Sequence, residues 1–231
     1  MSDHIAPLLL PFAPAKAAAA IHHRPRWIPA LAVVILVQIL LEVLAHPVMV
    51  EETLRRLPES ATNEERAVVR DDLDTAVPVD LGMIPIKEAG AVALGAVVLG
   101  LLVTVASPRQ RPRAAHLVAV LAGIAIISGI EKGAETAFLS YSAHTHGLPA
   151  FPWSALAFVH HDGLPYAAAL LLTIINLFTL WYVVALGRAL AVLCNVSTAH
   201  AVLIALVFRA ASAGCTIALL HLLRNAYAFT F

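Results

Sequence analysis

The sequence predicts an all-α, polytopic membrane protein: a bundle of five transmembrane helices with the N-terminus inside and the C-terminus outside. Of the 231 residues, 60% are hydrophobic and 13% are charged, whereas a soluble domain carries roughly a quarter charged residues. The apolar residues gather in runs of about 20, which is enough to cross a ~30 Å hydrocarbon core. No run alternates in polarity as the strands of a transmembrane barrel do, and a helix satisfies its own backbone in lipid.

Each predicted span is an apolar run bounded by polar residues. A 26-residue leader precedes the first span, so this span is too long and too far from the N-terminus for a cleaved signal peptide. The five spans cover residues 27–46, 86–106, 115–141, 164–187 and 199–223.

The charges between the spans predict the orientation. The loop between spans two and three has three arginines and no acid, and the leader is also basic. The loop 47–85 has four arginines among nine acids, and the loop before span four has no Lys or Arg. Because positive residues in short loops stay in the cytoplasm, the leader and the loop between spans two and three are expected inside. Their basic residues are Lys16, Arg24, Arg26, Arg109, Arg111 and Arg113.

Two parts follow from this pattern: a cytoplasmic leader, 1–26, and a transmembrane domain, 27–231. Within the leader, the alanine-rich residues 13–24 predict a short interfacial helix along the inner surface. The external loop 47–85 predicts two short amphipathic helices broken at 58–63. Ser60 or Thr62 is expected to cap the second of these, because Glu64 and Glu65 follow in its first turn.

Small residues in the spans favour close packing of the helices. Gly129 with Gly133, and Ala210 with Gly214, form small-xxx-small pairs. Such pairs let helix backbones approach each other where lipid supplies no hydrophobic drive. They are typical of a tight bundle or a homo-oligomer.

No common catalytic or nucleotide-binding motif stands in a usable context, so neither an enzyme nor a cofactor is expected. The segment 144–163 does hold histidines and an aspartate between two apolar runs. Neutral imidazole binds Zn, Cu or Ni, but it is also common at a membrane surface, and it titrates near neutral pH. A wet turn, a pH-responsive loop and a metal site therefore stay open, and the weak metal candidates are His144, His146, His160 and His161.

Five charged residues fall inside predicted spans and away from the very start of a span, and a charge costs at least about 2.5–3.5 kcal/mol at mid-depth. Lys132 can reach Glu135 one turn away, and Arg209 is expected to pair with an acid of a neighbouring span, Glu131 or Glu42. Either a structural network or a polar site for an ion, a proton or a lipid head group would explain them. The predicted polar network comprises Glu42, Glu131, Lys132, Glu135 and Arg209.

Two stretches resemble the prokaryotic Yip-domain family, whose eukaryotic members interact with Ypt/Rab GTPases in membrane trafficking. One is the leader PAKAAAAIHHRPRWIPAL followed by a long acidic loop. The other is INLFTLWYVVALGRALAVLCNVSTAHAVLIAL, which is similar to the family's penultimate span and the turn after it. The long acidic N-terminal region of the eukaryotic members is absent from this sequence. The residues that carry the second stretch are Phe178, Trp181, Gly187, Ser197 and Ala201.

The resemblance implies a non-enzymatic, membrane-organising or scaffold protein of the prokaryotic cytoplasmic membrane. Its expected partners are membrane lipids, other proteins or further copies of the chain, and not nucleic acid. Two alternatives remain. One is a small ion-coupled transporter that uses the intramembrane acids, and the other is a membrane protein that binds a metal through the outer histidines.

Overall fold

The computed structural model describes residues 5–58, 60–107, 112–142, 154–155, 168, 172 and 174–228. These residues are mainly helical, and the one β pairing among them is an isolated bridge between Ser154 and Asn176. In chain order the elements are the 3-10 helix η1 (Pro7–Leu9) and the α-helices α1 (Pro14–His23), α2 (Ile28–Arg56), α3 (Asn63–Ala106), α4 (Ala114–Ser142), α6 (Leu177–Leu193) and α7 (Thr198–Ala228).

Four described helices, α2, α3, α4 and α7, are long and apolar enough to cross a membrane. They confirm the prediction of an all-helical, membrane-embedded chain. The predicted fourth span, 164–187, overlaps α6 only from Leu177 onward, and most of residues 164–173 lie outside the described part of the chain. Helix α6 is apolar but only 17 residues long.

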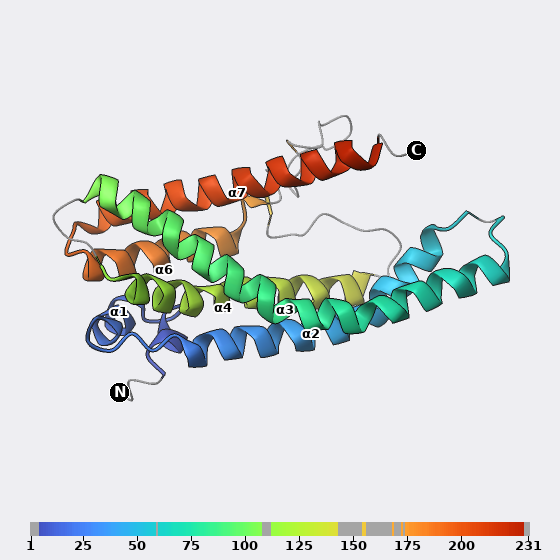
Figure 1. Cartoon of the computed structure of the whole chain (residues 1–231), viewed down its shortest axis with the longest axis horizontal. Coiled ribbons are helices and arrows are strands. Elements are labelled where there is room, and N and C mark those ends of the chain that lie inside the picture. The colour runs from blue at the N-terminus through green and yellow to red at the C-terminus, as the bar shows by residue number, and fades with distance from the viewer. Residues whose placement is uncertain are drawn as a thin grey trace.

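The helices run lengthwise between two ends of the molecule (Figure 1). We call the end where α1, the last residues of α3 and the 194–197 turn lie the leader end, and the end where α2 stops and α3 begins the hairpin end. The predicted end of the fourth span at residue 187 is too early, because α6 continues to Leu193. The apolar run after Arg188 extends the helix, and Asn195 then turns the chain with a left-handed φ of 47°, a conformation that Asn tolerates.

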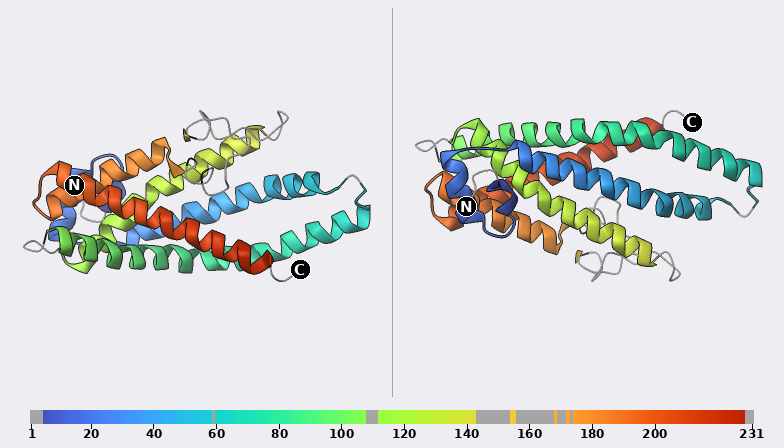
Figure 2. Two further views of the ribbon diagram at one scale, coloured as in Figure 1. Left: turned by 90° about the horizontal axis from the view of Figure 1, so that it is seen from above. Right: turned by 90° about the horizontal axis from the view of Figure 1, so that it is seen from below.

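Helices α2 and α3 form a long hairpin that extends beyond the other helices (Figure 2). At 1.5 Å per residue, the 44 residues of α3 reach roughly 66 Å, more than twice the ~30 Å hydrocarbon core. The two short helices predicted within 47–85 are not separate helices, because they are the end of α2 and the beginning of α3. Pro47, Pro78 and Pro85, a residue type that commonly breaks a helix, all lie inside α2 and α3.

A capping box starts α3. The backbone N–H of Glu65 donates to Thr62 Oγ1 at 3.2 Å, and the backbone N–H of Thr62 donates to Glu65 Oε2 at 2.7 Å. Of the two candidates proposed from the sequence, Thr62 is therefore the N-cap.

Replacing Thr62 with Ala is expected to destabilise the hairpin tip by about 1 kcal/mol, because the backbone N–H of Glu65 loses its side-chain acceptor. Amide hydrogen exchange of residues 63–70 should speed up, while exchange in α4 stays unchanged. Thr75→Ala, an exposed threonine of the same helix, is the control. Equal exchange at 63–70 in both variants would contradict the capping role.

The leader is part of the packed bundle. Ala17, Ala18 and Ile21 of α1 are fully buried, and α1 packs mainly on α6. Ahead of α1, the backbone carbonyl of Pro11 accepts a hydrogen bond from Trp181 Nε1 at 2.7 Å, and the ring of Phe12 lies 5.8 Å from that indole. The predicted helix at 13–24 is thus confirmed, and its apolar face covers protein.

Candidate functional site

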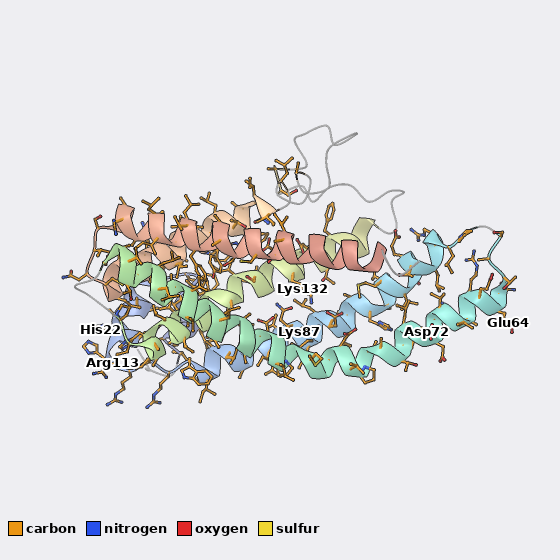
Figure 3. All side chains as sticks on the ribbon, turned by 45° about the horizontal axis from the view of Figure 1, so that its top comes forward. His22, Glu64, Asp72, Lys87, Arg113 and Lys132 are labelled. Carbon is orange, nitrogen blue, oxygen red and sulfur yellow. The ribbon has the colours of Figure 1, made fainter. Side chains whose placement is uncertain are left out.

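The predicted charged network lies at mid-length in the molecule. Figure 3 shows Lys87 and Lys132 there, with Glu64 at the hairpin end and His22 and Arg113 at the leader end. The candidate site is therefore set between helices α2, α3, α4, α6 and α7, away from both ends.

Lys132 of α4 is paired with Glu42 of α2. Its Nζ lies 2.9 Å from Glu42 Oε2, a charge-assisted contact between residues 90 positions apart. The sequence paired Lys132 with Glu135 one turn along α4 instead. Glu135 does interact electrostatically with Lys132 and with Glu131, but the ion pair goes to the neighbouring helix. A tertiary contact thus replaces the predicted local one.

A polar cavity of about 290 Å³ surrounds this ion pair. Its walls come from α2, α3 and α4, and charged or amide side chains make up nearly all of them. The polar residues that line it are Gln38, Glu42, Asp80, Lys87, Glu88 and Lys132.

Glu131 interacts with α6. Asn176 Nδ2 donates to Glu131 Oε1 at 2.5 Å, while Asn176 Oδ1 caps α6 by accepting from the backbone N–H of Thr179 at 2.8 Å. The side chain of Asn176 therefore caps the N-terminus of α6 and also donates a hydrogen bond to a carboxylate of α4. The sequence indicated Glu131 but gave no sign of Asn176.

Arg209 of α7 lies against α6 and not against an acid. Its guanidinium carbon is 5.2 Å from the centre of the Tyr182 ring, and Nη2 is 3.5 Å from Thr179 Oγ1. Among the described residues no ion pair joins Arg209 to an acid, and its buried Nε has no hydrogen-bond partner. The predicted pairing with Glu131 or Glu42 is wrong, because these carboxylates face Asn176 and Lys132.

A second cavity, of about 490 Å³, lies around Arg209. Gln38 and Glu88 line both cavities, so the two adjoin between α2 and α3. The walls of the larger cavity are mixed: apolar residues of α3, α4 and α7 stand beside a few polar groups. The polar residues are Gln38, Glu88, Ser128, Tyr182, Arg209, Ser212 and Thr216.

The two cysteines are free and lie apart. Cys194 follows α6, where burial raises the pKa of its thiol to about 11. At neutral pH this thiol stays protonated and is a poor nucleophile or metal ligand. Cys215 is exposed and lines the larger cavity.

The four candidate histidines of the loop, His144, His146, His160 and His161, lie outside the described residues. Within the described part, no group of three His, Cys, Asp or Glu side chains is placed to hold a metal. Two other histidines have clear contacts. His46 Nε2 lies 2.7 Å from Asp74 Oδ1 across the hairpin, and the ring of His22 stacks on His116.

The sequence missed several residues of the two cavities, and for some of them a signal existed. Lys87 and Glu88 stand in IPIKEAG at the very start of the predicted span 86–106, where a charge pair was easy to assign to the membrane surface. The polar residues Gln38 and Tyr182 lie inside spans, but neither is unusual there. That Gln38 and Tyr182 line a cavity is seen only in the folded structure, where five helices bring the lining residues together.

Comparison with protein-family models, curated proteins and solved structures finds no match for this chain. The functional argument below therefore rests on the contacts, cavities and charges of the chain itself.

Proposed function

We propose that this chain is a non-enzymatic, Yip-type integral membrane protein that acts as a scaffold in a prokaryotic cytoplasmic membrane. In this proposal α6 completes a fifth span together with residues before it. The leader end lies inside and the hairpin end outside.

The residues that carry the Yip resemblance make interhelical or capping contacts, which supports the proposal. Trp181 of the second stretch donates to the carbonyl of Pro11, just before the first stretch. Helix α1 of the first stretch also packs on α6 of the second, so the two stretches touch. Gly187 lies against Val202, and Ala201 is fully buried. Ser197 Oγ accepts from the backbone N–H of His200 at 3.3 Å at the start of α7. Residues that hold helices together or cap them are the ones that proteins of one fold are expected to share.

The observation that favours a scaffold is the helical hairpin. Two candidate spans continue into it without a break, so a partner bound there is held at a fixed distance from the bundle (Figure 1). The His46–Asp74 contact and the donation of Arg66 Nη1 to the carbonyl of Leu54 at 3.5 Å join its two helices. The exposed surface of α3 in the hairpin is acidic, which favours a basic partner surface. Its exposed acids are Glu64, Glu65, Asp71, Asp72 and Asp74.

Reporter fusions test the orientation. Residue 110 and the 194–197 turn are expected to report from the cytoplasm, and residues 60 and 150 from outside. The reason is that the arginine-rich 109–113 segment resists translocation. A cytoplasmic signal from residue 60 would contradict both the orientation and the external hairpin.

Affinity purification from native membranes tests the scaffold role. The double variant Asp71→Asn, Asp72→Asn is expected to lose a basic partner that the wild type retains, with the loss growing at low ionic strength. Arg70→Gln, which removes a neighbouring positive charge, is the matched control and should retain it. An identical set of co-purifying proteins in all three samples would argue against the hairpin as the binding surface.

A second candidate, a small ion-coupled transporter, is favoured by one observation: two adjoining cavities that hold acids and bases between the spans. Cation or proton flux into liposomes that depends on Glu88, and is abolished in Glu88→Gln, would support it. Glu64→Gln, at the hairpin tip, is the control.

A further inference from the structure

The cavity around Arg209 presents an unmet requirement for an anion. Arginine keeps its proton at any relevant pH, so it cannot lower the cost of its position by becoming neutral. Its contacts in the described structure are a hydroxyl and the face of an aromatic ring, Thr179 and Tyr182. Neither carries a negative charge, and the buried Nε–H is left without an acceptor.

The position of Arg209 makes this requirement unusual. It lies 11 residues from the start of α7, roughly 16 Å along the helix axis, which is near the middle of a ~30 Å core. A structural arginine at this depth would be expected to face an acid of the bundle. Glu42 and Glu131 are instead bonded to Lys132 and Asn176.

The shape and lining of the cavity indicate a small amphiphile. Its volume of about 490 Å³ lies within the range of small-molecule sites, which are mostly apolar with a few polar groups that orient the ligand. Val92, Val98 and Leu121 form an apolar wall. Leu94, on the same lining, is 67% exposed, so the cavity opens at the outer surface of the bundle, where lipid lies.

Among the described residues that line this cavity the only acid is Glu88, which lies farther from the leader end than Arg209 does. It lies 18 residues from the end of α3, roughly 27 Å from the leader end, against roughly 16 Å for Arg209. Its principal charged neighbour is Lys132, in the smaller cavity. An anionic group held at Arg209 is therefore separated from the carboxylate of Glu88.

We propose that this cavity binds a membrane amphiphile through its anionic oxygens. The carboxylate or phosphate accepts from the guanidinium of Arg209 and from the Gln38 amide, and the acyl chain lies along Val92, Val98 and Leu121. This binding site is independent of the scaffold role proposed for the hairpin.

Native mass spectrometry of the purified protein in a neutral detergent tests the proposal. Hexadecanoate and phosphatidylglycerol are titrated separately, which distinguishes a carboxylate from a phosphate source. Hexadecanol supplies the same chain without charge, and inorganic phosphate supplies charge without a chain. At least one of the two anionic amphiphiles is expected to bind roughly tenfold or more tightly than hexadecanol. Equal binding of hexadecanol, or saturation by inorganic phosphate at the same concentration, would overturn the proposal.

Variants place the binding in the cavity. Arg209→Gln should lose the tenfold preference and Arg209→Lys should keep part of it, whereas Arg188→Gln, at an exposed arginine of α6, should bind as the wild type does. If Arg209→Gln does not fold, Ala211→Trp is tested instead. Its indole fills the cavity while Arg209 is retained, so binding of the anionic amphiphile should be lost. Its control is Ala210→Trp, next to it and outside the lining. Anionic binding unchanged in Arg209→Gln, or in Ala211→Trp when that variant decides, overturns the proposal.

Discussion

Replacing Lys132 with Met is expected to destabilise the protein by about 2 kcal/mol. The change leaves the carboxylate of Glu42 without its cation, and breaking one side of a buried pair costs more than the pair itself contributes. The value lies below the usual range for fully buried pairs because both side chains are partly exposed. For a chain of this size the expected fall in Tm is about 4–8 °C, measured in detergent or nanodiscs.

Two double variants separate the missing charge from a loss of packing. Glu42→Gln with Lys132→Met removes both charges and should recover much of the lost stability, as should the exchanged pair Glu42→Lys, Lys132→Glu. Lys87→Met, at an exposed lysine of the same cavity, is the control and should change Tm little. A Lys132→Met protein as stable as the wild type would show that the ion pair contributes nothing.

Gly187→Ala is expected to destabilise the α6–α7 packing by about 1–3 kcal/mol. A Cβ atom at this position would lie 2.5 Å from Val202 Cγ2 and 2.8 Å from Val202 Cα, so the two helices must move apart. Gly214→Ala is the matched control in α7, because no atom lies within 4 Å of a Cβ built there. That change should be neutral or stabilise by up to about 1 kcal/mol through helix propensity.

A third variant identifies the clash. Adding Val202→Ala to Gly187→Ala removes the contact with Cγ2 but not the one with Cα, so the recovery of Tm should be incomplete. If Gly187→Ala and Gly214→Ala have the same Tm, close packing at Gly187 does not hold α6 and α7 together.

The sequence predicted the fold class well because hydropathy and helix length depend on each segment alone. The same holds for Thr62, whose cap involves neighbours in the chain. Contacts between helices depend on how each helix is rotated about its axis, which depth along the chain does not give. For this reason the sequence predicted that Arg209 pairs with Glu131 or Glu42, whereas the structure places Glu42 on Lys132, Glu131 on Asn176 and Arg209 on Tyr182.

The positions of close helix packing were likewise only partly predictable from the sequence. Gly129 and Gly133 do face α2, as a small-residue pair suggests: Cβ atoms built there would lie 3.4 Å from Val37 Cγ1 and 3.6 Å from Leu41 Cδ2. A Cβ built at Gly214, from the other predicted pair, meets no atom of the described residues within 4 Å, while the tightest contacts occur at Gly187 and Gly123, for which no such pair was predicted from the sequence. Spacing marks where helices can approach, but the partner helix decides where they do.

The docking of the leader has a consequence for the order of assembly. Residues 5–23 leave the ribosome before α4 and α6 do, yet Pro11 binds Trp181, 170 residues later, and Gly123 lies against the carbonyl of Pro7. Most of the surface on which the leader packs is therefore missing until α4 and α6 have been synthesised and inserted. Contacts of such sequence separation form slowly, because a long loop must close before they contribute. This early segment is accordingly among the last to reach its final place, after the helices that follow it have inserted and associated.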